Sequence, residues 1–198
     1  MAATSEEHRV VTNGMSQYSR NERNANSAVV VGIDPSDYPE HPLAGIEFQR
    51  KLESLAYEMG GSNYDAPAQR VGDFLKNKSS EKLGAIEPSF KPGIKLTNLA
   101  DALPDFCIEA IREAIPAFNR KIKGFALEDA LLTGVETRTS APINIKRDAH
   151  YQSVNTQGLF PAGEGAGYAG GIMSAAIDGI KVAEAVALNI NESLKSQV

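Results

Sequence analysis

A glycine-rich stretch near the C-terminal end carries the residue types best suited to binding a ligand. From position 163 to 172 the sequence is Gly-Glu-Gly-Ala-Gly-Tyr-Ala-Gly-Gly-Ile, with one acid, Glu164, and one aromatic residue, Tyr168. Glycine lets the backbone come close to a ligand and adopt positive φ angles. A helix that begins behind such a loop offers unpaired N–H groups and the positive end of its dipole. The stretch therefore predicts contact with an anionic ligand, and the alternative is a tight strand-to-helix turn that binds nothing.

The residues around this stretch favour the order strand, loop, helix. A short apolar run at 159–162 predicts a buried strand, and small and apolar residues recur at helical spacing from 172 to about 190. The spacing G-x-G-x-x-G at 165–170 matches the dinucleotide-binding fingerprint. That fingerprint requires a second strand with an acidic residue about 20 positions later. Because one helix and a short tail follow here, the stretch is not a complete Rossmann unit, and we expect it to pack on a sheet from elsewhere.

A second candidate is a pair of opposite charges, Glu136 and Arg138. From Ala130 onward the apolar pattern repeats every two residues, which predicts a strand with both charged side chains on one face. Two interpretations stay open. The pair either contacts a substrate at a cleft or forms an ordinary surface ion pair, and the residues by themselves favour neither.

Other reactive residue types give no site. The three histidines lie far apart in the sequence without metal-ligand spacing, so we predict no metal centre. The serines do not lie in a nucleophile-elbow pattern, which argues against a serine hydrolase. Cys107 has no neighbouring His or Cys, and we interpret it as a packing residue rather than a redox nucleophile.

Composition is that of an ordinary globular protein. Hydrophobic residues make up 42% and charged residues 23% of the 198 residues, and a chain of this length can bury a substantial core. A net charge of −5 excludes the basic footprint of a nucleic-acid-binding protein. The single cysteine excludes an internal disulfide and favours a reducing compartment. Without a long apolar run or an apolar N-terminus, we expect a cytoplasmic protein with no membrane span and no signal peptide.

Helical patterns dominate the middle of the chain. Helices are predicted at 44–59, where Gly60-Gly61 ends the pattern, and at 67–75, where proline suits the first turn. A third helix is predicted at 104–118, with Pro116 distorting its last turn. Its core face is expected to consist of Phe106, Ile108, Ile111 and Ile115.

Strands are expected on either side of this helical group, which predicts an α+β fold. A polar loop should connect the second and third helices over residues 76–95. Strand-like patterns, in addition to those at 130–138 and 159–162, occur at 9–12, 27–33 and 143–146.

Several segments together resemble one protein family. Gly134-Val-Glu-Thr-Arg-Thr-Ser-Ala-Pro, Gln152-Ser-Val-Asn and the run from Gly158 to Ile172 resemble the C-terminal portion of the uncharacterised bacterial FAD-dependent dehydrogenases, also called NAD(FAD)-utilising dehydrogenases. Earlier pieces also fit, at 13–16, 24–28, 41–49 and 66–69. Members of that family are much longer and start with an FAD-binding glycine loop that this chain lacks. We therefore expect a C-terminal fragment of a two-domain FAD-dependent oxidoreductase.

The resemblance implies two domain portions. Residues 1–146 would form a substrate-side domain with central helices, incomplete at its N-terminus. Residues 147–198 would supply the C-terminal strand, loop and helix of the FAD-binding domain.

The resemblance also implies a cofactor site. Glu164 would accept a hydrogen bond from a ribityl hydroxyl of FAD. The N–H groups of Gly170, Gly171 and Ile172 would face the pyrimidine side of the flavin, where a positive helix end stabilises negative charge. Tyr168 would either flank the ring or pack within the loop. The full set of implied cofactor-binding residues is Gly163, Glu164, Gly165, Gly167, Tyr168, Gly170, Gly171 and Ile172, with Glu136 and Arg138 toward the substrate and the flavin edge.

The implied function is flavin-dependent dehydrogenation of a small-molecule substrate, with NAD(P)H as a possible electron donor and no catalytic residue identified. The partner would be an N-terminal FAD-binding domain, which supplies the pyrophosphate and adenosine sites. We expect this chain by itself to be colourless and inactive. The alternative is a non-catalytic ligand-binding or interaction domain that retains the glycine-rich loop.

Overall fold

The computed structural model describes residues 5–15 and 17–195. The chain divides into two compact units, which we describe separately. Unit 1 contains Met1–Tyr38 and Glu47–Thr137, and unit 2 contains Pro39–Ile46 and Arg138–Val198. None of the helices in the described part of the chain is long and apolar enough to cross a lipid bilayer. The domain boundary expected between residues 146 and 147 concerns a longer protein and stays a prediction.

A small mixed sheet lies in unit 1. Its strands are β1 (Ala66–Arg70), β2 (Ile94–Leu96) and β3 (Leu131–Thr133), in the order β2-β1-β3. The central strand β1 pairs parallel with β2 and antiparallel with β3. Residues 66–69 of β1 are all buried, because β1 is covered on both faces.

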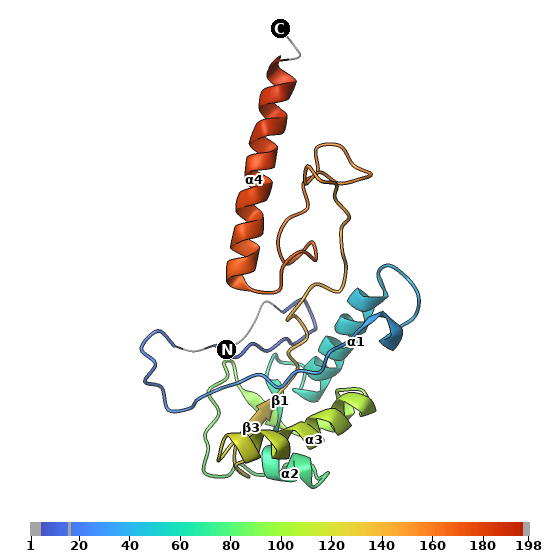
Figure 1. The fold of residues 1–198 in the computed structure, drawn as a ribbon. Helices are drawn as coiled ribbons and strands as arrows, with labels where there is room; N and C mark the ends of the chain where they lie inside the picture. Colours follow the sequence, from blue (N-terminus) through green and yellow to red (C-terminus); the bar gives the residue numbers. More distant parts are fainter. Residues whose placement is uncertain (1–4, 16, 196–198) are drawn as a thin grey trace. The chain divides into compact units, whose positions relative to one another are not determined.

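The α-helices of unit 1 lie beside this sheet, as Figure 1 shows. They are α1 (Ala44–Met59, whose first turn belongs to unit 2), α2 (Val71–Leu75) and α3 (Asp105–Lys121). Short 3-10 turns lie at η1 (Pro35–Asp37) and η2 (Leu99–Asp101). Helix α1 ends at Met59, and the next residue must be glycine because a Cβ on Gly60 would lie 1.9 Å from the Asp65 carbonyl oxygen. The fold is therefore α+β, as predicted.

The core of unit 1 consists of two hydrophobic clusters. The first joins Leu52 and Ala56 of α1 to residues from other segments: Val10, Ala66, Phe90, Ala102 and Val135. The second joins α2 to α3 and contains Val71, Phe74, Leu99, Ile108, Ile111 and Ile115. Burying such side chains is the main source of folding free energy.

Unit 2 is largely irregular chain beside one long helix, α4 (Ile172–Lys195, 24 residues). A single antiparallel bridge joins Arg147 to Ser153 within the described residues of this unit. Helix α4 buries only Val182, and many of its large apolar side chains are exposed: Ile172, Met173, Ile177, Ile180, Leu188, Ile190 and Leu194.

The predicted helices at 44–59 and after Gly171 are confirmed, and α4 continues one turn beyond the predicted end. Helix α3 is also confirmed but continues through Pro116 to Lys121. Its last turn is held from outside the helix, because Asn119 Oδ1 accepts from the N–H groups of Gly124 and Ala126 at 3.0 and 3.1 Å. Phe106 was wrongly assigned to the core. It is 41% exposed, and Cys107 is buried in the core instead.

The predicted helix at 67–75 is wrong in its first half. Pro67 lies inside β1, where its carbonyl accepts from the Gly134 N–H at 3.0 Å, and the helix begins only at Val71. The loop predicted at 76–95 is two residues too long, because β2 already begins at Ile94. Sheet pairing from segments distant in sequence overrides the local proline signal here.

Three predicted strands, at 27–33, 143–146 and 159–162, are not strands in the structure. In the first, Val29 and Val31 pack against the core while Val30 is 61% exposed, but no neighbouring strand pairs with this segment in the described structure. Leu159 is 45% exposed rather than buried, and its carbonyl accepts from Ser153 N–H at 2.8 Å.

The strand predicted from 130 to 138 stops at Thr133. After Thr133 the backbone no longer pairs with β1. It contacts the N-terminal segment instead, where the Val135 carbonyl accepts from Thr12 N–H at 2.9 Å. The strand-like segment at 9–12 is extended and largely buried, although it forms no regular strand.

Candidate functional site

The glycine-rich loop of unit 2 is closed by its own hydrogen bonds. Gly167 N–H donates to the Glu164 carbonyl at 2.9 Å, and Tyr168 N–H donates to the Gly163 carbonyl at 3.0 Å. Gly163 and Gly167 have φ angles of 66° and 80°, which favour glycine. A Cβ on Gly167 would lie 2.4 Å from the Ile143 carbonyl oxygen. Both glycines are therefore required by the conformation of the loop itself.

Three other glycines of the loop have no such internal reason. A Cβ on Gly165 would meet no heavy atom within 4 Å, and none of the three has a positive φ. On Gly170 and Gly171 the Cβ would meet only a serine hydroxyl at 3.7 Å, which is ordinary contact. The described residues would accept alanine at all three positions. Their backbone is accessible to a group that the chain does not itself provide.

The start of α4 presents unpaired backbone donors next to these glycines. The first amide to close the helix is that of Ala175, which donates to the Gly171 carbonyl at 2.9 Å. The N–H groups from Gly170 to Ser174 have no acceptor among the residues that the structure describes. Such a helix end carries partial positive charge. The loop and the helix start therefore fit an electron-rich ligand laid against the backbone.

Glu164 is half-buried at the first turn of the loop. Its backbone carbonyl closes the loop, whereas its carboxylate makes no hydrogen bond or ion pair within the described part of the chain. A carboxylate of this kind can accept hydrogen bonds from a hydroxyl-bearing ligand.

Tyr168 lies against an arginine that the sequence did not single out. The Arg147 guanidinium lies 3.7 Å from the centre of the Tyr168 ring, and Arg147 N–H donates to the Tyr168 hydroxyl at 3.1 Å. One face of the Tyr168 ring is thus occupied by the guanidinium. One of the two predicted roles of Tyr168 is to flank the flavin ring. In that role, only the other face of the Tyr168 ring could stack on the ligand.

Arg147 also forms a two-pronged ion pair with Asp178 on the second turn of α4. Nη2 donates to Asp178 Oδ1 at 2.6 Å and Nη1 donates to Oδ2 at 2.9 Å. The two side chains are only 9% and 12% exposed. The Arg147 hydrogen bond, helped by the N–H of Gly163, lowers the pKa of Asp178 to about 2, and the same pairing raises the pKa of Arg147. Both groups are therefore charged at neutral pH.

Arg147 and Asp178 were missed because 31 residues separate them and neither forms a local motif. One signal was available. Asp178 is the first acid in a helix start made otherwise of small and apolar residues, and an acid in such a place requires a partner.

Glu136 and Arg138 are not placed on one strand face, since β3 ends before both. Glu136 belongs to unit 1 and Arg138 to unit 2. Glu136 is half-buried, and burial raises the pKa of its carboxyl. A role for the two residues toward a substrate stays a prediction.

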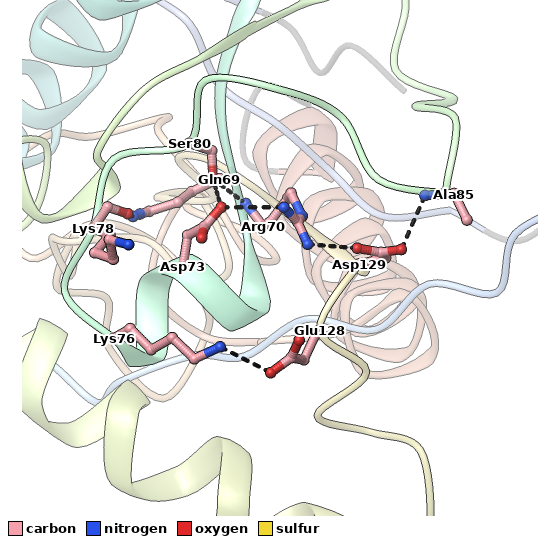
Figure 2. A network of polar contacts seen from close by, with 9 residues as sticks. All are labelled: Gln69, Arg70, Asp73, Lys76, Lys78, Ser80, Ala85, Glu128 and Asp129. Carbon is pink, nitrogen blue, oxygen red and sulfur yellow. Dashed lines mark hydrogen bonds and ion pairs between the residues drawn. The ribbon is translucent and has the colours of Figure 1, made fainter.

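Unit 1 contains a second polar cluster, around Arg70, which Figure 2 shows. Arg70 Nη2 donates to Asp129 Oδ1 at 2.6 Å, and Nη1 lies 3.7 Å from Asp73 Oδ2. Ser80 Oγ donates to Asp73 at 2.8 Å and accepts from Arg70 N–H at 2.9 Å. Asp129 also accepts from the Ala85 N–H at 3.0 Å. Both carboxylates are paired with Arg70, so this cluster ties the segments of unit 1 together and leaves the arginine without a free edge for an anionic ligand.

No group of three or more His, Cys, Asp or Glu side chains among the described residues is arranged to hold a metal ion. The glycine-rich loop with the start of α4 is therefore the best candidate site in the chain.

Comparison with known proteins connects the chain to flavoproteins. The family model described as "FAD-dependent protein, C-terminal domain-like" matches residues 1–139, which include all of the described sheet but not the glycine-rich loop. A protein of Clostridium beijerinckii, described as an uncharacterized protein, is 56% identical over 185 residues. The match covers 93% of this chain but 35% of that relative, so the chain spans about a third of the relative's length. Since the family model covers well over half of its residues, the chain belongs to the FAD-dependent protein, C-terminal domain-like family.

Proposed function

We propose that this chain is part of a flavin-dependent oxidoreductase, in which it supplies a substrate-side region and a loop that closes on FAD. Membership of an FAD-dependent family supports a flavoprotein. The observation that carries the site is the set of Gly165, Gly170 and Gly171, whose missing side chains serve no purpose within the described chain, beside unpaired amides at the start of α4.

The residues of the loop fit the proposed cofactor. Glu164 would accept a hydrogen bond from a ribityl hydroxyl, and its carboxylate has no competing partner among the described residues. The N–H groups of Gly170, Gly171 and Ile172 would donate to the pyrimidine side of the ring. FAD supplies hydride chemistry when bound, and the positive end of α4 would favour the negative charge that accumulates on reduction.

The proposed partner is an FAD-binding domain carried by the rest of a longer protein. Helix α4 exposes Ile172 (90%), Met173 (71%) and Ile180 (63%), and neighbouring large apolar side chains left exposed in this way indicate a surface that another protein part covers. The Clostridium relative has a further two-thirds of its length outside the match, which is room for such a domain. The pyrophosphate and adenosine of FAD would bind there, so this chain by itself should not retain FAD.

A small-molecule substrate, NAD(P)H as electron donor and a cytoplasmic location complete the proposal. The single cysteine supports a reducing compartment. Glu136, half-buried with a raised pKa, and Arg138 are the residues that we propose toward the substrate.

The test uses a full-length protein of the relative's size that carries this segment. We expect it to be purified yellow, and Glu164→Ala to weaken FAD retention by about 1–3 kcal/mol, the usual cost of leaving a buried partner unsatisfied. Gly170→Val should weaken retention more, by pushing the backbone away from the ring. The measurement is flavin absorbance relative to protein, with a titration of FAD into the apoprotein.

Gly32→Val is the matched control for Gly170→Val. A Cβ on Gly32 meets no heavy atom within 4 Å, so this change causes no clash either, and Gly32 lies in unit 1. Wild-type occupancy in both loop variants would mean that the loop is only a turn. A colourless wild-type protein would instead favour the non-catalytic binding domain.

A further inference from the structure

The glycine-rich loop is fastened to α4 by one arginine, and this arrangement carries an inference that rests on the proposed function and deepens it. Arg147 begins a tight turn in which Asp148 Oδ1 accepts from the N–H groups of His150 and Gln152 at 2.9 and 3.0 Å. The turn brings Tyr151 over the guanidinium at 4.6 Å. The turn therefore fixes the position of the Arg147 guanidinium, ahead of the glycine-rich loop in the sequence.

The guanidinium contacts both ends of the loop and the helix behind it. At the loop entrance, Arg147 Nη1 donates to the Pro161 carbonyl at 2.8 Å. At the loop exit, the Tyr168 ring lies against the guanidinium at 3.7 Å. On α4, Asp178 binds both Nη atoms and its Oδ2 also accepts from Gly163 N–H at 2.8 Å.

These contacts leave Arg147 with little capacity to bind a ligand directly. Its side chain is 9% exposed, its two Nη atoms are paired with oxygen atoms of the chain, and aromatic rings lie against it. An arginine that binds phosphate needs its planar edge free. Arg147 therefore stabilises the glycine-rich loop and does not itself bind an anionic ligand.

The geometry points to Arg147 and Asp178 as positioning residues, which hold the loop in its binding conformation and set where the amides of Gly170 to Ile172 lie. A loop that is ordered in advance avoids the entropy cost of ordering on binding. The consequence is that a change at Arg147 should weaken FAD binding and alter the flavin environment although Arg147 does not contact FAD.

The first experiment uses this 198-residue chain and needs no flavin. Arg147→Lys keeps the positive charge but loses the planar fork. Asp178→Asn removes the negative charge and leaves one acceptor oxygen where Arg147 and the Gly163 N–H together use two. Amide exchange followed by NMR at Gly163, Gly167 and Tyr168 should become at least about tenfold faster in both variants, as expected when a charge-assisted hydrogen bond is lost. Unchanged exchange in both variants would overturn the inference.

The second experiment uses the full-length flavoprotein. Arg147→Lys should raise the Kd for FAD by about tenfold and, at saturating FAD, should leave an altered visible circular dichroism of the flavin. A purely structural role would lower occupancy but restore the wild-type spectrum at saturation. A wild-type spectrum with faster exchange would therefore also overturn the inference.

Arg112→Lys is the matched control. Arg112 likewise lies over an aromatic ring (Phe74, 5.1 Å) and donates to a carbonyl at 3.0 Å, but it belongs to unit 1. It should change neither the exchange of the loop nor the flavin spectrum. If wild-type protein binds no FAD, the proposed function fails; that failure is distinguishable, because exchange in the short chain still reports whether Arg147 orders the loop.

Discussion

The two units of this chain differ in how far they bury their large apolar side chains. In unit 1 the large apolar residues are enclosed, with Phe74 and Ile115 each 1% exposed. In unit 2 the longest helix of the chain buries only Val182, while Ile177 and Ile180 are 50% and 63% exposed. Unit 1 is therefore a folded core with its partners inside the chain, and unit 2 is a surface that offers apolar side chains and backbone donors outward.

The ion pairs of the two units show the opposite trend. Arg70 and Asp129 in unit 1 are 26% and 32% exposed, whereas Arg147 and Asp178 in unit 2 are 9% and 12% exposed. Unit 1 can hold its segments together by apolar packing, so its ion pairs lie near the surface. Unit 2 has little apolar packing within the described chain, and a buried, hydrogen-bonded ion pair takes over the task of fixing its loop.

The largest expected effect tests this contrast directly. Phe74→Ala should reduce the free energy of unfolding by about 3–5 kcal/mol, since it leaves a cavity in a closed core. Ile177→Ala on α4 should change it by less than about 0.5 kcal/mol, since the side chain is half exposed. Urea unfolding followed by NMR resonances of each unit measures both. An equally costly Ile177→Ala would show that α4 is covered within the chain.

The next effect separates two glycines of one loop. Gly167→Ala should destabilise unit 2 by about 2–4 kcal/mol, because it combines a left-handed φ with a Cβ that overlaps the Ile143 carbonyl. Gly165→Ala should be neutral within about 0.5 kcal/mol in this chain. Resonances of unit 2 during urea unfolding give both values. Equal effects would contradict the assignment of Gly165 to an outside group.

The pH dependence of unit 2 follows from Asp178. Its folded pKa, about 2, is depressed below the ordinary 3.8, so its contribution is fully present above pH 4 and is lost as the pH falls through 2. The loss should amount to about 2 kcal/mol. NMR titration of the Asp178 carboxyl carbon measures the midpoint, and Asp178→Asn removes the dependence. A midpoint near 4 would show that the pair with Arg147 is not formed in solution.

The smallest effect lies in the cluster of Figure 2. Lys76 Nζ and Glu128 Oε1 are 2.9 Å apart, but the side chains are 60% and 69% exposed. Lys76→Ala should therefore cost less than about 0.5 kcal/mol, as exposed ion pairs usually do. Thermal unfolding checks this, and a larger loss would mean that the pair is coupled to the Arg70 cluster.

The sequence predicted what depends on local patterns and failed where distant segments decide. Helix α1 was predicted to its last residue because its apolar stripe and the terminal Gly60 are local. The strand β1 was taken for a helix because Pro67 suits a first helical turn. Pairing with β2, 28 residues away, and with β3, 61–65 residues away, fixes it as a strand.

The candidate site divides in the same way. The glycines, Glu164 and the helix start lie within ten residues and were identified from the sequence alone. The pair that orders them, Arg147 and Asp178, depends on the three-dimensional path of an irregular segment, which has no periodicity to recognise. In an irregular segment, a single sequence can therefore reveal the residues of a candidate site without revealing the residues that hold them in place.

The buried thiol of Cys107 can be used to measure how often unit 1 opens transiently. Burial on α3, together with the nearby negative charge of Asp37, raises the pKa of this thiol, so that it stays protonated and enclosed in the native state. Alkylation by a thiol reagent then requires transient exposure. Because the chain has one cysteine, the labelling rate divided by the rate of the unfolded chain gives the opening equilibrium of unit 1 without introducing a cysteine by mutation.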